Sequence, residues 1–368
     1  MDEYGTMRQD IVQLARIALG GRDHDTLVFV RKLARKYRSN DSALSEDLTG
    51  LLRRTPVRGN PARKIELGTL PVDSDTRLPL IRVAEFPVLE IEPIYERNTR
   101  DRLQQLIQEQ AEAHRLRAAG IDPTRTVLFT GPPGVGKTYA AKWIARELQR
   151  PLMTLDLSAV MSSFLGRTGN NVRVVLDYAK GRDCVLLLDE LDAVAKRRDD
   201  STEIGELKRL VTVLLQEIDE WPSTGLLLAA TNHSDLLDSA VWRRFESVIR
   251  FDLPDETHLG AMCQELLDLP ADSAWIKILG ITLKGLSFSD AVQYVRRARR
   301  TAVLNGDGTT RLLEQIVRER IDGLNRNDRQ SLAILLINQA EISQREVSRL
   351  TGVSRDTIRK RREDVVEA

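Results

Sequence analysis

The sequence predicts an α/β fold in which a mostly parallel sheet carries helices on both faces, with further helical units beside it. Short apolar runs of strand length recur along the middle of the chain, and segments with helical periodicity separate them. The predicted strands are 126–130, 152–156, 184–189, 225–230 and 247–251. This alternation is typical of parallel strands, because each strand needs a crossover helix before the next one. After Pro254 the apolar residues repeat only with helical spacing.

Changes in periodicity and in turn residues divide the chain into segments, and its 368 residues are enough for two or three domains. We expect a helical N-terminal domain over 1–54, a linker with some strand over 55–97, an α/β domain over 98–253, a helical subdomain over 254–324 and a last helical unit over 325–368. Extended runs at 78–83 and 88–91 are the strand candidates of the linker. The polar run Asn325-Arg326-Asn327-Asp328 predicts a hinge before the last unit.

The composition is that of an ordinary globular protein, with 42% hydrophobic and 30% charged residues. Because the net charge is only +1, any binding of nucleic acid would need a local basic patch. Cys184 and Cys263 lie in apolar surroundings, which predicts buried free thiols in a reducing compartment. The N-terminus is acidic and no run is long enough to span a bilayer. We therefore expect a cytoplasmic protein without a membrane partner.

A glycine-rich loop follows the first of the predicted strands and precedes a helix. Its residues are Gly131, Pro132, Pro133, Gly134, Val135, Gly136, Lys137 and Thr138. Glycines allow backbone amides to surround phosphate groups, and the N-terminus of the next helix adds to that attraction. The pattern predicts an ATP site with Lys137 on the β- and γ-phosphates and Thr138 as a ligand of Mg²⁺. The alternative, a turn with a chance lysine, is disfavoured by the flanking strand and helix.

Polar side chains end two further strands. Asp189 and Glu190 follow one apolar run, and Asn232 follows another. Asp189 suits the carboxylate beside Mg²⁺, and Glu190 suits the general base that activates the attacking water. Asn232 is placed to bond the same water or the γ-phosphate. The alternatives are a solvated acidic strand end and an asparagine that only forms a turn.

The pair Arg243-Arg244 has no obvious partner inside its own chain. An arginine from a neighbouring subunit that stabilises charge on the γ-phosphate is a known part of phosphoryl transfer. The pair therefore predicts an ATPase whose active site is completed by a second copy of the chain.

These motifs together resemble those of the AAA family, over roughly residues 98–324. The segments that carry the resemblance are Gly131–Thr138, Leu186–Val194, Ala229–His233 and Ala240–Glu246. The most similar branch is the one with the membrane-bound AAA proteases, katanin and spastin. The resemblance implies a hexameric ring that binds ATP between subunits and remodels a protein substrate. In such a ring Asp189 and Glu190 form the Walker B pair and Asn232 is the first sensor.

This chain departs from the family pattern at three places, one of which is that no second-sensor arginine stands near residues 285–291, as is also usual in the branch. Val135 stands where threonine is usual, and Arg243 and Arg244 are adjacent where the branch separates its arginines by Pro-Gly. Either arginine is then a candidate finger, and Arg244, next to Phe245, is the favoured one. The family position of Phe164, Leu165 and Gly166 implies a loop in the pore of the ring that grips an extended polypeptide. The alternative is a core phenylalanine near a helix end.

The C-terminal segment 343–362 predicts a helix-turn-helix. Ser343 and Glu346 form a capping box, Thr351-Gly352 forms a turn, and Ser354 caps a second helix. That second helix presents basic side chains suited to duplex DNA, namely Arg355, Arg359, Lys360 and Arg362. Asp356, Glu363 and Asp364 dilute this charge. The alternative is a module that docks protein or stabilises the ring.

Two functional classes follow from these motifs. The first is a ring-forming ATPase that threads or remodels a protein substrate. Since the chain has no zinc or nucleophile motif, the resemblance suggests a separate, subtilisin-like protease as its partner. The second is a DNA-linked ATP switch that docks through residues 343–362. The pore loop favours the first class and the C-terminal segment favours the second, and we predict the first.

Overall fold

The structure is a computed structural model, and it divides into two compact units. The described residues are 3–19, 23–38, 41–54, 70–73, 77–85, 87–158, 168–193, 204–237, 239–338 and 342–366. The first unit comprises 1–93, 98–132 and 137–251. The second unit comprises 94–97, 133–136 and 252–368, so it includes the middle of the glycine-rich loop.

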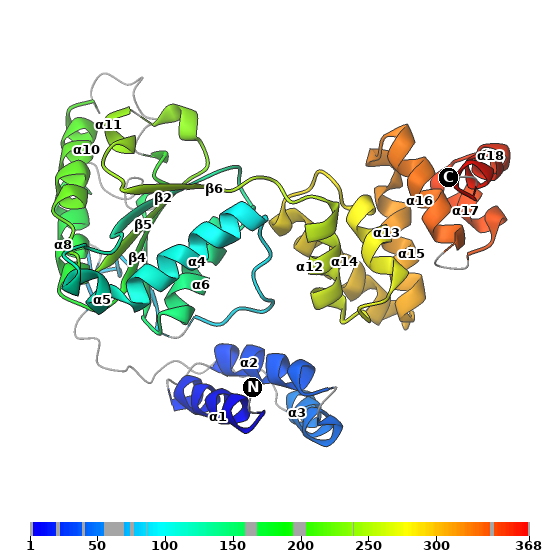
Figure 1. Cartoon of the computed structure of the whole chain (residues 1–368), viewed down its shortest axis with the longest axis horizontal. Coiled ribbons are helices and arrows are strands. Elements are labelled where there is room, and N and C mark those ends of the chain that lie inside the picture. Colours follow the sequence, from blue (N-terminus) through cyan, green and yellow to red (C-terminus); the bar gives the residue numbers. More distant parts are fainter. Residues whose placement is uncertain are drawn as a thin grey trace. The chain divides into compact units, whose positions relative to one another are not determined.

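The first unit contains a six-stranded sheet in the order β1-β3-β4-β5-β2-β6 (Figure 1). Its strands are β1 (Arg82–Ala84), β2 (Thr126–Thr130), β3 (Leu152–Asp156), β4 (Val185–Asp189), β5 (Leu226–Thr231) and β6 (Ser247–Arg250). β1 pairs with β3 in the antiparallel sense, and the other pairs are parallel. The five strands predicted from the sequence agree with β2 to β6 within one residue at each end. The predicted α/β fold class is therefore confirmed.

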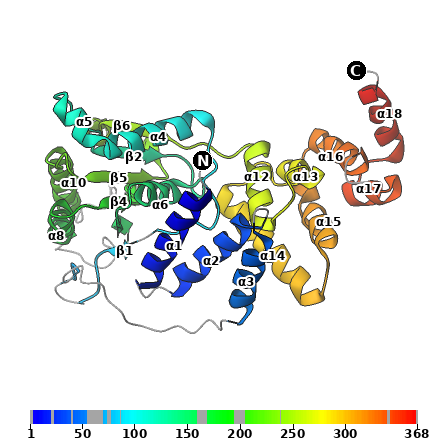
Figure 2. The ribbon, with the colours of Figure 1, turned by 60° about the horizontal axis from the view of Figure 1, so that its bottom comes forward.

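Apolar side chains on both faces of the central strands explain this layered arrangement. Leu128 of β2, Leu186 of β4 and Leu227 of β5 are fully buried in one core with α8 (Thr168–Lys180) and α10 (Ile204–Asp219). On the other side lies α6 (Lys137–Glu147), which contacts β3, β4 and β5 (Figures 1 and 2). β2, β4 and β5 are buried on both faces and lie inside the sheet, where each pairs with two neighbouring strands. The first unit also contains α4 (Arg97–Ala111), α5 (Ala113–Ala118), η1 (Ser234–Leu236) and α11 (Ser239–Trp242).

The N-terminal region forms a bundle of three helices, α1 (Glu3–Leu19), α2 (Asp23–Lys36) and α3 (Ser42–Arg54), which lie side by side in Figure 2. Ile17, Phe29 and Leu33 form its core, and Val88 from the following segment packs against them. The helical prediction is confirmed here. Of the two strand candidates in the linker, the first overlaps β1, whereas 88–91 is not a strand. The reason is that Ile91 bonds through both its N–H and its carbonyl to the hydroxyl of Tyr139, so no strand satisfies them.

The second unit is helical. Its first helices are α12 (Glu256–Leu267), α13 (Ala274–Thr282), α14 (Phe288–Asn305), α15 (Thr309–Arg320) and η2 (Ile321–Gly323). Hydrogen-bonding side chains cap the starts of three of them, as short polar residues do elsewhere. Asp255 accepts from the amide of His258, Ser273 from that of Trp275, and Ser287 from that of Asp290.

The chain ends in α16 (Arg326–Asn338), α17 (Gln344–Thr351) and α18 (Arg355–Val366). The predicted hinge at 325–328 is wrong, because these residues are the N-cap and first turn of α16. Asn325 Oδ1 accepts from the Asp328 amide at 2.9 Å, and the Lys284 ammonium pairs with Asp328. One apolar core joins α16–α18 to the preceding helices: Ile278, Ile281, Val317 and Ile321 pack with Leu332, Leu336, Val347 and Ile358. A run of asparagine and aspartate marks a helix start here, and not a free joint.

Cys184 and Cys263 are free and buried, as predicted. Burial raises the pKa of the Cys184 thiol to about 11 and that of the Cys263 thiol to about 12. Both are therefore protonated and unreactive at neutral pH. Among the described residues, no helix has the length and apolar character needed to cross a membrane.

Candidate active site

The backbone of the glycine-rich loop requires glycine. Gly131, Gly134 and Gly136 have φ values of 144°, 78° and 100°, in the region that side chains disfavour. A Cβ on Gly131 would lie 2.0 Å from the carbonyl oxygen of Phe251, so no other residue fits there. Val135, the position that departs from the family pattern, is 1% exposed. Its side chain packs in the interior, and the substitution leaves the loop intact.

Within the second unit, the loop lies against the N-terminus of α14. The Ser289 amide donates to the Gly134 carbonyl at 3.0 Å, and a Cβ on Gly134 would approach Ser287 Oγ to 2.3 Å. Ser287 is also the N-cap of α14. No local sequence pattern predicts this contact, because it joins residues about 150 positions apart. It means that the loop conformation depends on the start of α14 as well as on its own glycines.

Lys137 is almost fully buried, with 6% of its surface exposed. Its ammonium donates to the carbonyls of Gly131 and Pro132 at 2.7 and 2.8 Å, and to Asn232 Oδ1 at 2.7 Å. Burial lowers the pKa of Lys137 from 10.5 to about 8, against the opposing attraction of nearby carboxylates. The ammonium is thus charged at neutral pH. The structure places Asn232, predicted as a sensor, directly on the lysine of the loop.

Thr138 and Asp189 form the second contact of the site. Thr138 Oγ1 donates to Asp189 Oδ2 at 3.0 Å, and this links the start of α6 to the end of β4. A hydroxyl and a single carboxylate are the oxygen donors that proteins offer to Mg²⁺ when phosphates supply further ligands. Among the described residues, no group of three or more His, Cys, Asp or Glu side chains is placed to hold a metal ion. The pair Thr138 and Asp189 fits Mg²⁺ bound together with ATP, whose phosphates would supply further ligands.

Glu190 has a strained backbone. Its φ of 58° lies in the left-handed region, which is rare for a residue with a side chain and costs roughly 1–3 kcal/mol. Its amide donates to Asp189 Oδ1 at 3.0 Å, and its side chain is exposed. Strain of this kind is more often found at functional positions than at ordinary strand ends. It supports the prediction that Glu190 is held in place for chemistry.

Asp192 is a site residue that the sequence reading missed. It is 4% exposed, and its Oδ1 accepts from Thr231 Oγ1 and from the Asn232 amide, both at 3.2 Å. Its charge also favours the charged form of Lys137. The sequence feature that could have indicated this role is its position, three residues after Asp189 and just after an apolar strand. It fixes the end of β5, from which Asn232 reaches Lys137.

The two candidate arginines differ in their surroundings. The prediction that neither has a partner in its own chain is wrong for Arg244, whose guanidinium pairs with Asp219 at 2.5 Å. Arg243 is exposed, and within the described part of the chain its side chain makes no hydrogen bond or ion pair. Asp219 is the last residue of α10, and it lies beside Arg244 only in the folded chain. The position of Arg244 next to Phe245 favours it as the finger, and the pairing with Asp219 counts against that assignment.

The remaining predicted contacts lie on other parts of the chain. Phe164, Leu165 and Gly166 fall outside the described residues, as does the side chain of Arg362. Arg355, Arg359 and Lys360 are exposed on α18.

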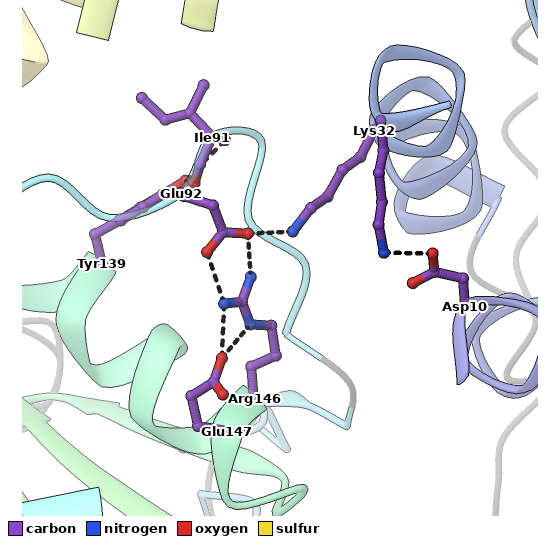
Figure 3. Close-up of polar contacts among 8 residues, drawn as sticks. Asp10, Lys32, Ile91, Glu92, Tyr139, Arg146 and Glu147 are labelled. Carbon is purple, nitrogen blue, oxygen red and sulfur yellow. Dashed lines mark hydrogen bonds and ion pairs between the residues drawn. The ribbon is translucent and has the colours of Figure 1, made fainter. Parts of the chain in front are cut away.

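An ionic network ties the N-terminal bundle to α6, the helix that follows the glycine-rich loop. Figure 3 shows Glu92 between Lys32 of α2 and Arg146 of α6, with Glu147 on the far side of Arg146. Burial alone would raise the pKa of Glu92, but the bonds from Arg146 and Lys32 outweigh it and lower the pKa to about 2. The segment before α4 therefore fastens α6 to the bundle.

Comparison with known proteins identifies the family. The model described as "ATPase family associated with various cellular activities (AAA)" matches residues 127–253. An uncharacterized AAA family ATPase of Sinorhizobium fredii, y4kL, is 36% identical over 252 residues, which are 66% of this chain and 74% of that relative. The chain belongs to the AAA family. This AAA protein is accordingly an ATP hydrolase, as its motifs predicted.

Two further relatives carry a functional name. A proteasome-activating nucleotidase of Methanococcus maripaludis is 35% identical over 196 residues, and proteasome-activating nucleotidase 2 of Halobacterium salinarum is 35% identical over 176 residues. The matches cover 51% and 43% of this chain. The AAA protein spans about half the length of these relatives, 48% and 43%.

Proposed function

We propose that this protein is a ring-forming ATPase that uses ATP hydrolysis to remodel or thread a protein substrate. The observation that carries the ATPase part is the bonded set Lys137, Asn232, Thr138 and Asp189, which gathers at the carboxyl ends of β4 and β5 and at the start of α6. Ligands of parallel sheets bind at this edge. Relatives named for proteasome activation support a polypeptide as the substrate.

The residues divide the work of phosphoryl transfer. Lys137 supplies a fixed positive charge to the β- and γ-phosphates, and its buried setting strengthens that attraction. Asn232, held by Asp192, orients the γ-phosphate or the attacking water. Glu190 accepts the proton of that water through its carboxylate as the oxygen attacks phosphorus. Thr138 and Asp189 would hold Mg²⁺, which neutralises charge on the phosphates when it is bound.

A homo-oligomeric ring, with six subunits by family resemblance, completes the proposed site. Arg243 is exposed and Arg244 is held by Asp219, so we assign the finger to Arg243 and the positioning of the loop to Arg244. The test mixes inactive subunits into wild-type protein. Excess Arg243→Ala subunits should depress ATPase activity below simple dilution, because each blocks a neighbour. Activity that follows only the wild-type fraction would argue against a site shared between subunits.

The protein-substrate part of the proposal rests on Phe164, Leu165 and Gly166 as a pore loop. An aromatic side chain grips polypeptides without reading sequence, since it offers apolar contact to any side chain. We further propose a separate, subtilisin-like protease as the recipient of the substrate and a cytoplasmic location, in keeping with the two free thiols. Assignment to the branch of katanin and spastin is part of the same proposal.

One purified variant tests threading. An unfolded polypeptide such as casein should raise the ATPase rate of the wild type, and in Phe164→Ala the ratio of stimulated to unstimulated rates should fall to about one. Thermal melting serves as the control for folding. A stable Phe164→Ala variant with full stimulation would contradict threading. An early melting variant would assign Phe164 to the core, where truncation costs roughly 3–5 kcal/mol, and would equally remove the pore-loop assignment.

The second candidate function is a DNA-linked ATP switch, and the observation that favours it is the exposed basic surface of α18. The two candidates differ in what stimulates the ATPase. Polypeptide stimulation without an effect of duplex DNA supports remodelling, and the reverse result supports the switch.

A further inference from the structure

The C-terminal segment concentrates positive charge that the rest of the chain lacks. Residues 344–366, which span α17 and α18, contain seven basic and four acidic side chains, a net charge of +3 in a protein whose total is +1. ATP chemistry uses none of them. A local excess of this size attracts a polyanion, whichever kind it is.

The fold of this segment gives the charge a fixed shape. Gly352, with a φ of 68°, ends α17, and α18 begins three residues later. Ser343 Oγ accepts from the Glu346 amide and Ser354 Oγ from the Thr357 amide, so each helix has the N-cap that the sequence predicts. The Gln344 side chain donates to the Arg355 carbonyl at 3.1 Å and locks the two helix starts together.

Burial decides which face of these helices is available. Val347, Val353 and Ile358 pack in the core shared with α16, and Leu350 is buried as well. Arg345 of α17 and Arg355, Arg359 and Lys360 of α18 are exposed. Arg355 and Arg359 are four residues apart and thus share one side of the helix. Arg349 of α17 is exposed as well, and it pairs with Glu346 of the same helix.

We propose that α18 binds double-stranded DNA by lying in the major groove, with Arg345 at the start of α17 on the phosphate backbone. Two helices joined by a short turn place their second helix in this way, and its first residues reach the base edges. Arginine is the side chain best matched to guanine edges and to phosphates. The proposal rests on the second candidate function and specifies the ligand of that surface. Because DNA binding is measured without nucleotide, its failure is distinguishable from a failure of the ATPase function.

The composition of the unit favours duplex over single strands. Residues 326–368 contain no Phe, Tyr or Trp. Proteins that bind single-stranded nucleic acid stack the bases on aromatic rings, whereas duplex binding needs only charge and a helix of suitable shape. The apolar core that joins α16–α18 to α13 and α15 holds the surface rigid. A rigidly held basic helix fits the major groove of duplex DNA, whose shape is regular.

The experiment uses the full-length protein without nucleotide and a labelled, random-sequence duplex of 30 base pairs. Fluorescence anisotropy over a series of salt concentrations should give an affinity that falls steeply as salt rises. Arg355→Ala, Arg359→Ala and Lys360→Ala should each weaken binding severalfold and reduce the log–log salt slope by about one. Arg300→Ala removes the same charge from an exposed position on α14 and should leave the binding curve unchanged.

Several results would overturn the proposal. The first is that the protein does not bind the duplex at 50 mM salt. The second is that the α18 variants bind the duplex as tightly as the wild type does. The third is that single-stranded DNA or polyglutamate displaces the labelled duplex as well as unlabelled duplex does. The last result would assign the surface to acidic polymers in general, including protein partners. Point variants are chosen over truncation, because removal of α16–α18 would expose Ile278, Val317 and Ile321 of the preceding helices.

Discussion

Lys137 and the cations of α18 are both proposed to meet phosphate groups, yet the protein holds them in opposite ways. Lys137 is buried and bonded to three oxygen atoms of its own chain. Arg355, Arg359 and Lys360 are exposed on a helix surface. A buried, preoriented charge interacts strongly with one ligand in one geometry, whereas exposed charges add small contributions that salt screens. The contrast teaches that burial, and not charge, distinguishes the lysine proposed to bind ATP from the cations proposed to dock DNA.

The largest expected effect concerns chemistry at the proposed ATP site. Glu190→Gln keeps the size of the side chain but removes the base, so the rate of ATP hydrolysis should fall by roughly 10²–10⁴. Phosphate release measures the rate, and titration with fluorescent ATP measures affinity, which should stay within about threefold. Glu220→Gln, at an exposed glutamate just after α10, is the control. Loss of ATP binding in Glu190→Gln, with the fold intact, would contradict the role of base.

A second change removes the buried charge itself. Lys137→Ala should weaken ATP binding by roughly a hundredfold or more, because one charge-assisted contact in a buried site contributes several times more than a surface contact. The measurement is the same fluorescent-ATP titration. If Lys137→Ala lowered ATP affinity only severalfold, as one α18 substitution should lower DNA affinity, burial would not distinguish the two regions.

A third, smaller effect tests the support behind the site. Asp192→Asn preserves shape but weakens the acceptor that holds the end of β5 and the Asn232 amide. Looser positioning of Asn232 should lower kcat by roughly tenfold, about 1.4 kcal/mol in activation free energy. Steady-state kinetics with separate kcat and KM values measure it. An unchanged kcat would leave Asp192 as a structural residue only.

The smallest effect belongs to the half-exposed network of Glu92, which lies between the two extremes. Since its pKa is lowered from 4.5 to about 2, its stabilising contribution is complete above pH 4.5 and is lost as the pH falls toward 2. Exposed pairs contribute about 0.5–1 kcal/mol, so Glu92→Gln should lower Tm by about 1–3 °C at pH 6. Melting curves should show the difference between the two proteins shrinking below pH 4.5 and vanishing only as the pH approaches 2. A constant difference across this range would exclude the ion pairs as its source.

The sequence predicted the parts of this structure that depend on local pattern. The strands follow from continuous apolar runs, and the caps at Ser343 and Ser354 follow from spacing alone. What it missed depends on tertiary contacts. Asp219 meets Arg244 only because α10 ends beside that loop, and Asp192 is an ordinary acidic residue until β5 ends against it. Asn325–Asp328 looked like a hinge because helix caps and loops use the same residues.

The core that α13 and α15 share with α16–α18 has a consequence for how the protein unfolds. Helices that bury one another's apolar side chains lose those contacts together, so this part of the chain should open as one cooperative segment. Amide protons in α16 should then exchange with solvent at the same rate as those in α13 and α15. Force applied to a ligand held by α18 would therefore be resisted by the whole segment, since no weaker joint separates α15 from α16.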